Sequence, residues 1–348
     1  MQSFTAHRLR FVTEVQTEIE LNEHQGSAIR GALFHALRDR FCSFADDDRI
    51  QCVDCTLATT CPVAKLVSTL APDHPRGQDR PRPYTLQPPL PGSGHPVDHP
   101  SGYVNFRYRP GEALTFGLTL YADAMALFPY VVLATTVLEE SGLGRRLQHA
   151  DGRWRRGTLT VREIWAENPL TGERQAVLRQ GEHQVQVPDI PVTHDQVLAK
   201  TSESLPPAPR GAPSQARLRF LTPTRLIDDG QLVKPEAFAF RPLLHRLITR
   251  LEDLSGLFSD HRLALDVPQL LEAAERVAVV DNRLTWEELT SYSTRRRTTS
   301  PTSGLLGTVI LEALDWAPFW PWLLWGQFVH VGKDAVKGNG MYTLTAEV

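Results

Sequence analysis

Alternating apolar and polar positions predict one early strand in each half of the chain, followed in each half by an amphipathic helix. The strand pattern LRFVT at residues 9–13 has a counterpart, LRFLT, at residues 218–222, 209 residues later. The helical pattern LFHAL at residues 33–37 has a counterpart, LLHRL, at residues 243–247, 210 residues later. This shared spacing favours an internal duplication.

The first helix is the most clearly patterned element. Ser27 is a favourable N-cap, because its hydroxyl can accept a hydrogen bond from a backbone N–H of the first turn. After it, apolar residues recur at helical spacing and form one stripe: Ile29, Ala32, Leu33, Ala36 and Leu37.

The opposite face of this helix carries the residues of chemical interest. Phe34, His35 and Arg38 point away from the apolar stripe, so we expect a histidine and an arginine on one exposed face. Gly31 lies one turn before His35 and leaves room for a ligand.

The remaining pattern predicts a mixture of helices and antiparallel strands. A hairpin of residues 103–108 and 113–121 is expected around Pro110-Gly111, and an apolar helix at residues 123–140 is expected to end at Gly142. Further strands are expected at residues 217–226, 304–313 and 340–346, and further helices at residues 237–256 and 268–276. The order of elements in both halves points to an α+β fold with helices on one face of an antiparallel sheet.

Proline-rich stretches suggest how the chain is divided. Residues 72–100 contain nine prolines and predict a long irregular loop, about 70–100. Residues 202–215 are rich in Ser, Pro and Ala and favour a domain boundary near residue 210. We therefore expect an N-terminal domain of residues 1–210 and a C-terminal domain of residues 211–348.

Composition narrows the class of protein. The 348 residues are 41% hydrophobic and 22% charged, which fits about two folded domains. A net charge of −3 argues against a protein that coats nucleic acid through bulk charge, although a local basic groove remains compatible. The N-terminus has no secretory pattern, and the longest apolar stretches contain prolines and are shorter than the ~20 residues that cross a bilayer. We expect a cytoplasmic protein with no membrane partner.

The four cysteines, Cys42, Cys52, Cys55 and Cys61, lie within twenty residues. Their spacing, C-x9-C-x2-C-x5-C, favours one tetrahedral site, with zinc held by four thiolates in a structural role. An iron–sulfur cluster is the alternative, because Cys-Pro ends such runs in ferredoxins. Unliganded thiols in a reducing compartment are the third interpretation.

The C-terminal segment 326–342 combines glycines with cations. Such a segment lets backbone N–H groups and lysines approach a phosphate chain closely. It lacks the ending of a Walker A loop, so no nucleotide cofactor is expected. A flexible glycine-containing hairpin is the alternative. The residues concerned are Gly326, His330, Gly332, Lys333, Lys337, Gly338 and Gly340.

Two basic runs and one tryptophan cluster have competing interpretations. Arg295, Arg296 and Arg297 follow Tyr292 and suit contact with an RNA backbone, whereas most such runs are solvated faces. A second basic cluster spans residues 145–156. The four tryptophans between residues 316 and 325 favour buried inter-domain packing over a base-stacking platform.

Four segments together resemble a known family. They are SAIRGALFHALR at residues 27–38, the cysteine cluster ending in Cys61-Pro62, YSTRR at residues 292–296, and the G-x-x-x-H-V-G-K…G-x-G-x-Y ending. The chain resembles the CRISPR-associated RAMP endoribonucleases that cut precursor CRISPR RNA within its repeats, in the branch with an N-terminal four-cysteine insertion. The resemblance implies tandem ferredoxin-like (RRM-type) domains, with the insertion at about residues 41–66.

The resemblance also implies a metal-independent cut that needs no cofactor and leaves a 2′,3′-cyclic phosphate. Members of this family usually take their general base from a histidine on or near the first helix, which makes His35 the first choice, His24 the second and His330 the third. Arg38 and Lys333 are expected to stabilise the transition state.

Contact with RNA is expected from the remaining candidates. Arg30, Lys337 and the three consecutive arginines at 295–297 are assigned to RNA binding together with the glycine-rich segment. The expected partners are CRISPR repeat RNA and crRNA, and other CRISPR effector subunits are further candidates. The alternative function is a catalytically silent subunit that holds crRNA in a CRISPR ribonucleoprotein.

Overall fold

The computed structural model describes residues 4–347 except 48–49, 51, 53, 69–80, 91, 99–103, 150, 183, 208–211 and 294–297. The chain forms two compact units. The N-terminal unit contains residues 7–168 and 172–191, and the C-terminal unit contains residues 192–348 together with the short segments 1–6 and 169–171. The expected boundary near residue 210 lies outside the described residues.

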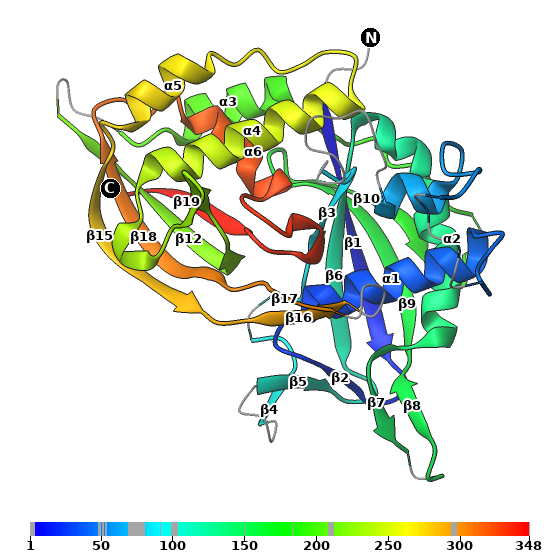
Figure 1. Ribbon diagram of the computed structural model, residues 1–348. Helices are drawn as coiled ribbons and strands as arrows, with labels where there is room; N and C mark the ends of the chain where they lie inside the picture. The colour runs from blue at the N-terminus through cyan, green and yellow to red at the C-terminus, as the bar shows by residue number, and fades with distance from the viewer. Residues whose placement is uncertain are drawn as a thin grey trace. The chain divides into compact units, whose positions relative to one another are not determined.

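The N-terminal unit is ferredoxin-like. Its main elements follow one another as β-α-β-β-α-β, and the sheet has the strand order β10-β9-β1-β6-β3, with β10 added at one edge (Figure 1). Helices α1 and α2 pack against each other, and buried residues of β1 such as Leu9 and Phe11 contribute to the core. The elements are β1 (Thr5–Val15), α1 (Gln25–Phe41), β3 (Tyr84–Gln87), β6 (Ala113–Tyr121), α2 (Phe128–Ser141), β9 (Leu159–Asn168) and β10 (Glu173–Arg179), with short helical turns η1 (Ala64–Ser68) and η3 (Ala122–Leu127).

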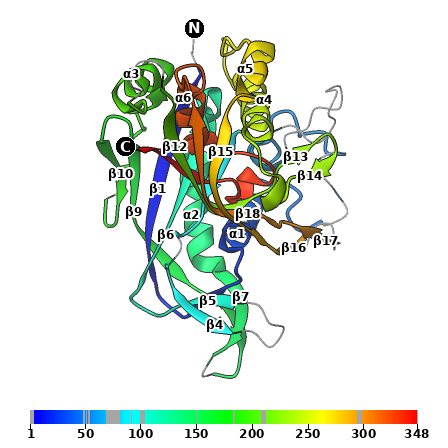
Figure 2. The same cartoon turned by 90° about the vertical axis from the view of Figure 1, so that its left-hand side faces the viewer.

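Shorter strands extend the N-terminal unit beyond its main sheet. One small sheet has the order β2-β5-β4, and β7 and β8 form a separate two-stranded hairpin. Both views place this hairpin at the same end of the unit as β5 (Figures 1 and 2). These strands are β2 (Ile19–Leu21), β4 (His95–Asp98), β5 (Val104–Tyr108), β7 (Leu143–Gln148) and β8 (Trp154–Gly157).

The C-terminal unit repeats the ferredoxin-like topology. Its sheet has the order β15-β18-β12-β19, and α4 and α6 occupy the two helical positions of the β-α-β-β-α-β sequence (Figure 1). The main elements are β12 (Ser214–Thr224), α4 (Phe240–Phe258), β15 (Ala278–Glu287), β18 (Gly304–Ala313), α6 (Trp320–Val329) and β19 (Tyr342–Glu347). The others are β11 (Val192–Thr193), α3 (His194–Ser204), β13 (Ile227–Asp228), β14 (Gln231–Leu232), η4 (Pro235–Ala237), α5 (Val267–Ala274), β16 (Thr290–Ser293), β17 (Thr298–Pro301) and η5 (Ala335–Lys337).

The expectation of tandem ferredoxin-like domains is thus confirmed, with three local corrections. The stretch 72–100 is not a single irregular loop, since it contains the ferredoxin strand β3 and the short strand β4. Helix α1 begins at Gln25, so His24 and not Ser27 is its N-cap. The expected strands 103–108 and 113–121 do not form a simple hairpin, because β5 pairs with β2 and β4 whereas β6 belongs to the main sheet.

The tryptophan cluster is core packing within the C-terminal unit. Trp316, Trp320 and Trp325 are buried, and each indole N–H has a partner. The N–H of Trp320 donates to the Ser204 hydroxyl at 2.9 Å, which links α6 to α3. A base-stacking role for this cluster is therefore wrong, and the packing is internal to one unit.

Residues 122–141 form one helical stretch that is long and apolar enough to cross a membrane by length and composition. In the structure this stretch is η3 followed by α2, which packs against α1 and β9. Its apolar residues, including Val131, Ala134 and Leu138, are buried. Packing of a ferredoxin-like core helix accounts for this composition.

The four cysteines are all described, all are partly exposed, and none of them forms a disulfide. Within the described part of the chain, no three His, Cys, Asp or Glu side chains gather closely enough to hold a metal ion. The donor set that we expected for zinc is therefore not assembled, and the structure does not support the zinc site or the iron–sulfur alternative.

Candidate active site

His35 lies on α1, on the face that the sequence pattern predicted to be exposed. Its side chain is half-buried, and its ring centroid lies 5.4 Å from that of Phe34. A Cβ built on Gly31, one turn earlier, would meet nothing within 4 Å. The helix backbone is therefore accessible beside the imidazole, as we inferred from the glycine.

Three arginines act on the imidazole of His35. Partial burial is the largest cause that lowers its pKa, and the positive charges of Arg156, Arg38 and Arg30 lower it further. Asp39 opposes this shift with a smaller effect than that of Arg156. The neutral imidazole, which is the form that accepts a proton, is therefore favoured at neutral pH.

Two of these arginines come from the same helix and one comes from a distant hairpin. The guanidinium of Arg30 lies over the Phe34 ring, 5.7 Å from its centroid, on the same helix as Arg38. Arg156 belongs to β8, and its neighbouring strand β7 packs against α1. The N-terminal unit thus combines a neutral base with several permanent cations, which can bind a phosphate and stabilise negative charge on it.

His24, the second-choice base, occupies a different environment. It is buried at the N-cap of α1, with φ −95° and ψ 62°. A general base must come within hydrogen-bond distance of the proton it removes. The half-buried His35 meets this requirement better than the buried His24.

The glycine-rich segment 326–342 is a tightly packed turn of the C-terminal unit. A Cβ on Gly326 would clash with the Tyr342 hydroxyl, which donates a 2.6 Å hydrogen bond to the Leu323 carbonyl. A Cβ on Gly340, whose φ is +76°, would clash with the Val331 carbonyl. These two glycines are therefore required for close packing of the backbone on itself.

Other members of this segment also have internal roles. His330 is fully buried, and its ring Nδ1 lies 3.1 Å from the Asn339 carbonyl oxygen. Gly338 is buried as well, and its backbone N–H donates to the Ala335 carbonyl. Because His330 is buried, direct contact of its side chain with RNA is unfavourable. Both His330 and Gly338 contribute to packing within the C-terminal unit.

The cations of the segment differ in their surroundings. Lys333 is exposed, whereas Lys337 is paired with Asp334 at 3.0 Å. Gly332 has φ +82°, and a Cβ there would clash with the Arg225 carbonyl. Lys333 is therefore the more available cation of the pair. Arg295, Arg296 and Arg297 lie outside the described residues.

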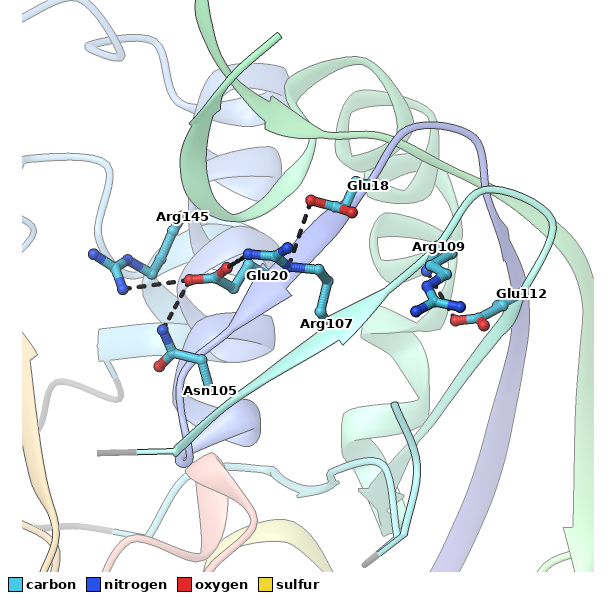
Figure 3. A network of polar contacts seen from close by, with 7 residues as sticks. All are labelled: Glu18, Glu20, Asn105, Arg107, Arg109, Glu112 and Arg145. Carbon is cyan, nitrogen blue, oxygen red and sulfur yellow. Dashed lines mark hydrogen bonds and ion pairs between the residues drawn. The ribbon is translucent and has the colours of Figure 1, made fainter. Parts of the chain in front are cut away.

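Sequence reasoning missed Arg156 as a member of the His35 site. The basic cluster at residues 145–156 was noticed, but nothing in the local pattern placed it beside a helix more than a hundred residues earlier. The N-terminal unit also holds a buried polar network at the base of this hairpin, centred on Glu20 (Figure 3).

Comparisons with known families cover most of the chain. A family model described as the AF_1859 N-terminal domain matches residues 4–190. A second model, described as the CRISPR-associated endoribonuclease Cas6, matches residues 218–342. No curated protein sequence matches the chain.

Solved structures share the fold at low sequence identity. A Cas6 product complex is 15% identical with a TM-score of 0.51, and the match covers 99% of both chains. A partial complex of Cas6-RT-Cas1 with Cas2 is 12% identical with a TM-score of 0.60, covering 99% of this chain and 47% of that one. These matches show the fold.

Proposed function

Because the chain belongs to the Cas6-type family of CRISPR-associated RAMP proteins, we propose that it is an endoribonuclease that cuts precursor CRISPR RNA within its repeats to give mature crRNA. One observation carries this proposal. Burial and the charges of three arginines lower the pKa of the His35 imidazole on α1, and Gly31, one turn earlier, leaves open space beside it. A base and cations placed together are what phosphodiester cleavage by the neighbouring 2′-hydroxyl requires.

In the proposed reaction, the neutral imidazole of His35 takes the proton of the 2′-hydroxyl. The 2′ oxygen then attacks the adjacent phosphorus, the bond from phosphorus to the 5′ oxygen breaks, and the products are a 2′,3′-cyclic phosphate and a 5′-hydroxyl. Arg30, Arg38 and Arg156 stabilise the negative charge that develops on the phosphorane. The leaving 5′ oxygen takes a proton from water, because the arginines keep theirs.

The proposed mechanism does not require a metal ion, since side chains supply both the general base and the positive charge. General-base catalysis by a positioned side chain contributes about 10²–10⁴-fold to rate. Preorganised cations around the phosphate add a further contribution. We therefore propose that cleavage proceeds without a divalent cation.

The test uses the full-length protein and its cognate repeat RNA in the presence of EDTA. We expect one cut in the repeat, a product with a 2′,3′-cyclic phosphate, and no cut when the nucleotide before the scissile phosphate is 2′-deoxy. Cleavage of the 2′-deoxy substrate would contradict the mechanism. Binding without any cleavage would contradict the enzyme and favour the silent crRNA-binding subunit.

We further propose that the protein works with other CRISPR proteins. The support is its structural similarity to about half of a chain in a partial Cas6-RT-Cas1–Cas2 complex. Co-purification of the chain with such proteins from cells that carry a repeat array tests this proposal.

A further inference from the structure

The β7–β8 hairpin of the N-terminal unit is strongly basic. Residues 143–157 contain five arginines and one aspartate. In β8 the first three side chains are exposed, and Trp154 is 63% exposed, which is unusual for a tryptophan. A cationic hairpin with an exposed aromatic ring at its outer part has the features of a site for nucleic acid.

The pairing of the arginines shows that this charge is not neutralised within the hairpin. Arg155 pairs with Asp151, and Arg145 reaches Glu20 at 3.4 Å. Arg146, Arg153 and Arg156 have no ion pair with a carboxylate among the residues that the structure describes. Three guanidinium groups are therefore available to an external anion.

The strand register brings two of these charges face to face. Arg146 is the cross-strand partner of Arg156, while Gln148 is the partner of Trp154. Like charges directly opposite each other destabilise an antiparallel pair. A phosphate bound between the two side chains would relieve this repulsion, whereas no described carboxylate of the protein does so.

The base of the hairpin is firmly anchored. A Cβ on Gly144 would clash with the Glu20 carbonyl, and a Cβ on Gly157 would clash with the Glu18 carbonyl, so both strands of the hairpin lie against β2. The Glu20 carboxylate also accepts a hydrogen bond from the Arg145 side chain (Figure 3). Since β7 packs against α1, the hairpin begins beside this helix, and it extends away from the helix (Figure 1).

We propose that the β7–β8 hairpin is an arm that binds a single-stranded RNA segment flanking the phosphate cut at His35. Arg146 and Arg153 bind successive phosphates, and one base stacks on Trp154. Trp154 and Arg156 are alternate residues of β8, so they lie ~6.7 Å apart on one face, and Arg146 shares this face as the cross-strand partner of Arg156. This inference rests on the proposed function, since it takes RNA as the substrate of the His35 site.

The exposed ring favours a single strand over a duplex. Bases in a duplex are stacked on each other, whereas an unpaired base can stack on an aromatic side chain. The arm would thus fix which phosphodiester reaches His35, because it holds the flanking nucleotides at a set distance from α1.

Two sets of variants test the arm without touching the His35 site. The first is Arg146→Gln with Arg153→Gln, and the second is Trp154→Ala with Trp154→Phe as the conservative variant. The matched control is Arg241→Gln with Arg276→Gln, which removes one partly exposed and one exposed arginine that already pair with Glu275 and Glu272 in the C-terminal unit. All the altered side chains are at least partly exposed, so we expect the variants to fold. Their thermal melting temperatures check this expectation.

The measurements are the dissociation constant for a repeat RNA with single-stranded flanks, its dependence on salt, and the single-turnover rate at saturating RNA. Loss of two phosphate contacts lowers the slope of log K against log salt by ~1.4. Trp154→Ala weakens binding about 5- to 150-fold, as expected for one lost stacking contact, and Trp154→Phe restores most of it. At saturating RNA we expect the variants to cut at neighbouring phosphodiesters as well, because the arm no longer fixes which one reaches His35.

The proposal is overturned if both sets of variants bind the flanked RNA with the wild-type affinity and salt slope, or if the control weakens binding equally. Failure of the proposed function gives a different result. In that case the wild-type protein does not cut RNA at all, while the binding measurement still shows whether the arm holds a single strand.

Discussion

Glu20 is a buried carboxylate on which the geometry of the hairpin base depends. It accepts hydrogen bonds from Asn105 and Arg107, both at 2.8 Å, and from Arg145 at 3.4 Å (Figure 3). Burial opposes ionisation of Glu20, but the hydrogen bonds from Arg107 and Asn105 and the two positive charges outweigh it and lower its pKa. We predict that Glu20→Ala destabilises the N-terminal unit substantially.

The magnitude follows from what each partner loses. Asn105 is 4% exposed, so leaving its amide without an acceptor costs ~1–3 kcal/mol. The charged bond to Arg107 adds ~1–2 kcal/mol, because its guanidinium is about one-third exposed and keeps Glu18 at 3.4 Å. Arg145 is about half exposed, and its contribution is below ~1 kcal/mol. These contributions add up to about 2–6 kcal/mol.

Two further variants separate these contributions. Glu20→Gln keeps an acceptor for Asn105 and loses only the charge, so it should cost about 1–2 kcal/mol. Arg145→Gln should cost less than ~1 kcal/mol.

The lowered pKa of Glu20 also sets the direction of the pH dependence. Ionised Glu20 stabilises the fold at pH values above its ordinary pKa, and this stabilisation is lost as pH falls through the pKa that Glu20 has in the folded protein.

Hydrogen exchange of peptides that cover β2 and β5 measures the local free energy of opening directly. Glu20→Ala should lower it by the full amount, Glu20→Gln by about half, and Arg145→Gln by little. The reasoning would be refuted if Glu20→Ala lay within 1 kcal/mol of the wild type, or if Arg145→Gln were as costly as Glu20→Ala.

Four other predictions concern single positions. The pH profile of kcat/KM should rise with pH to a plateau with an apparent pKa below 6.5, because burial and then the arginines lower the pKa of His35. The Arg156→Gln variant should move this inflection to higher pH. An inflection above 6.5 in the wild type would contradict the prediction. Gly31→Ala should raise the free energy of unfolding by about 0.8–1 kcal/mol, since its Cβ meets open space, and a lower melting temperature would count against it. Gly340→Ala should destabilise the C-terminal unit by at least about 2 kcal/mol, as seen in urea denaturation, because its φ is +76° and Val331 blocks the Cβ; a neutral variant would refute the packing role. Burial lowers the pKa of His7 to about 4, so protonation of His7 costs at most about 3 kcal/mol of stability as pH falls from 6.5 to 4. A His7→Gln variant that loses as much stability in acid as the wild type would exclude His7 as the cause of this acid sensitivity.

Periodicity predicted the elements whose local pattern agrees with the final fold. The apolar stripe predicted burial of Ile29, Ala36 and Leu37, which the structure confirms, whereas His35, expected on an exposed face, is half-buried. The strands β12 and β18 and the helix α4 were found from alternation and helical spacing for the same reason. Each of these elements buries one side and leaves the other polar, so its pattern is visible in the sequence.

Elements defined by distant contacts were missed. Strand β3 is only four residues long between prolines, and all four residues are buried, so neither alternation nor length revealed it. Pairing with β6 makes it a strand. Arg156 was missed for a similar reason. Its position near α1 depends on the packing of β7 against that helix, which the local sequence does not reveal.

The glycine-rich ending shows a second kind of limit. Gly326 and Gly340 were assigned to phosphate contact, because glycine permits close approach of a backbone to a ligand. In the structure the close approach is made by the Tyr342 hydroxyl and the Val331 carbonyl. A glycine pattern predicts that another group lies close to the backbone, but it does not tell whether that group belongs to the protein or to a ligand. The fold is needed to identify the group.

The proposal that His35 removes the 2′-hydroxyl proton is tested most directly by the single-turnover cleavage rate of His35→Ala on cognate repeat RNA in EDTA, with the dissociation constant measured in parallel. His95→Ala is the matched control, because His95 is half exposed and pairs with Glu112 in the same unit. Loss of the base should slow cleavage by about 10²–10⁴-fold, leave RNA affinity within a few fold, and leave the control unchanged. Cleavage by His35→Ala at the wild-type rate would contradict the account.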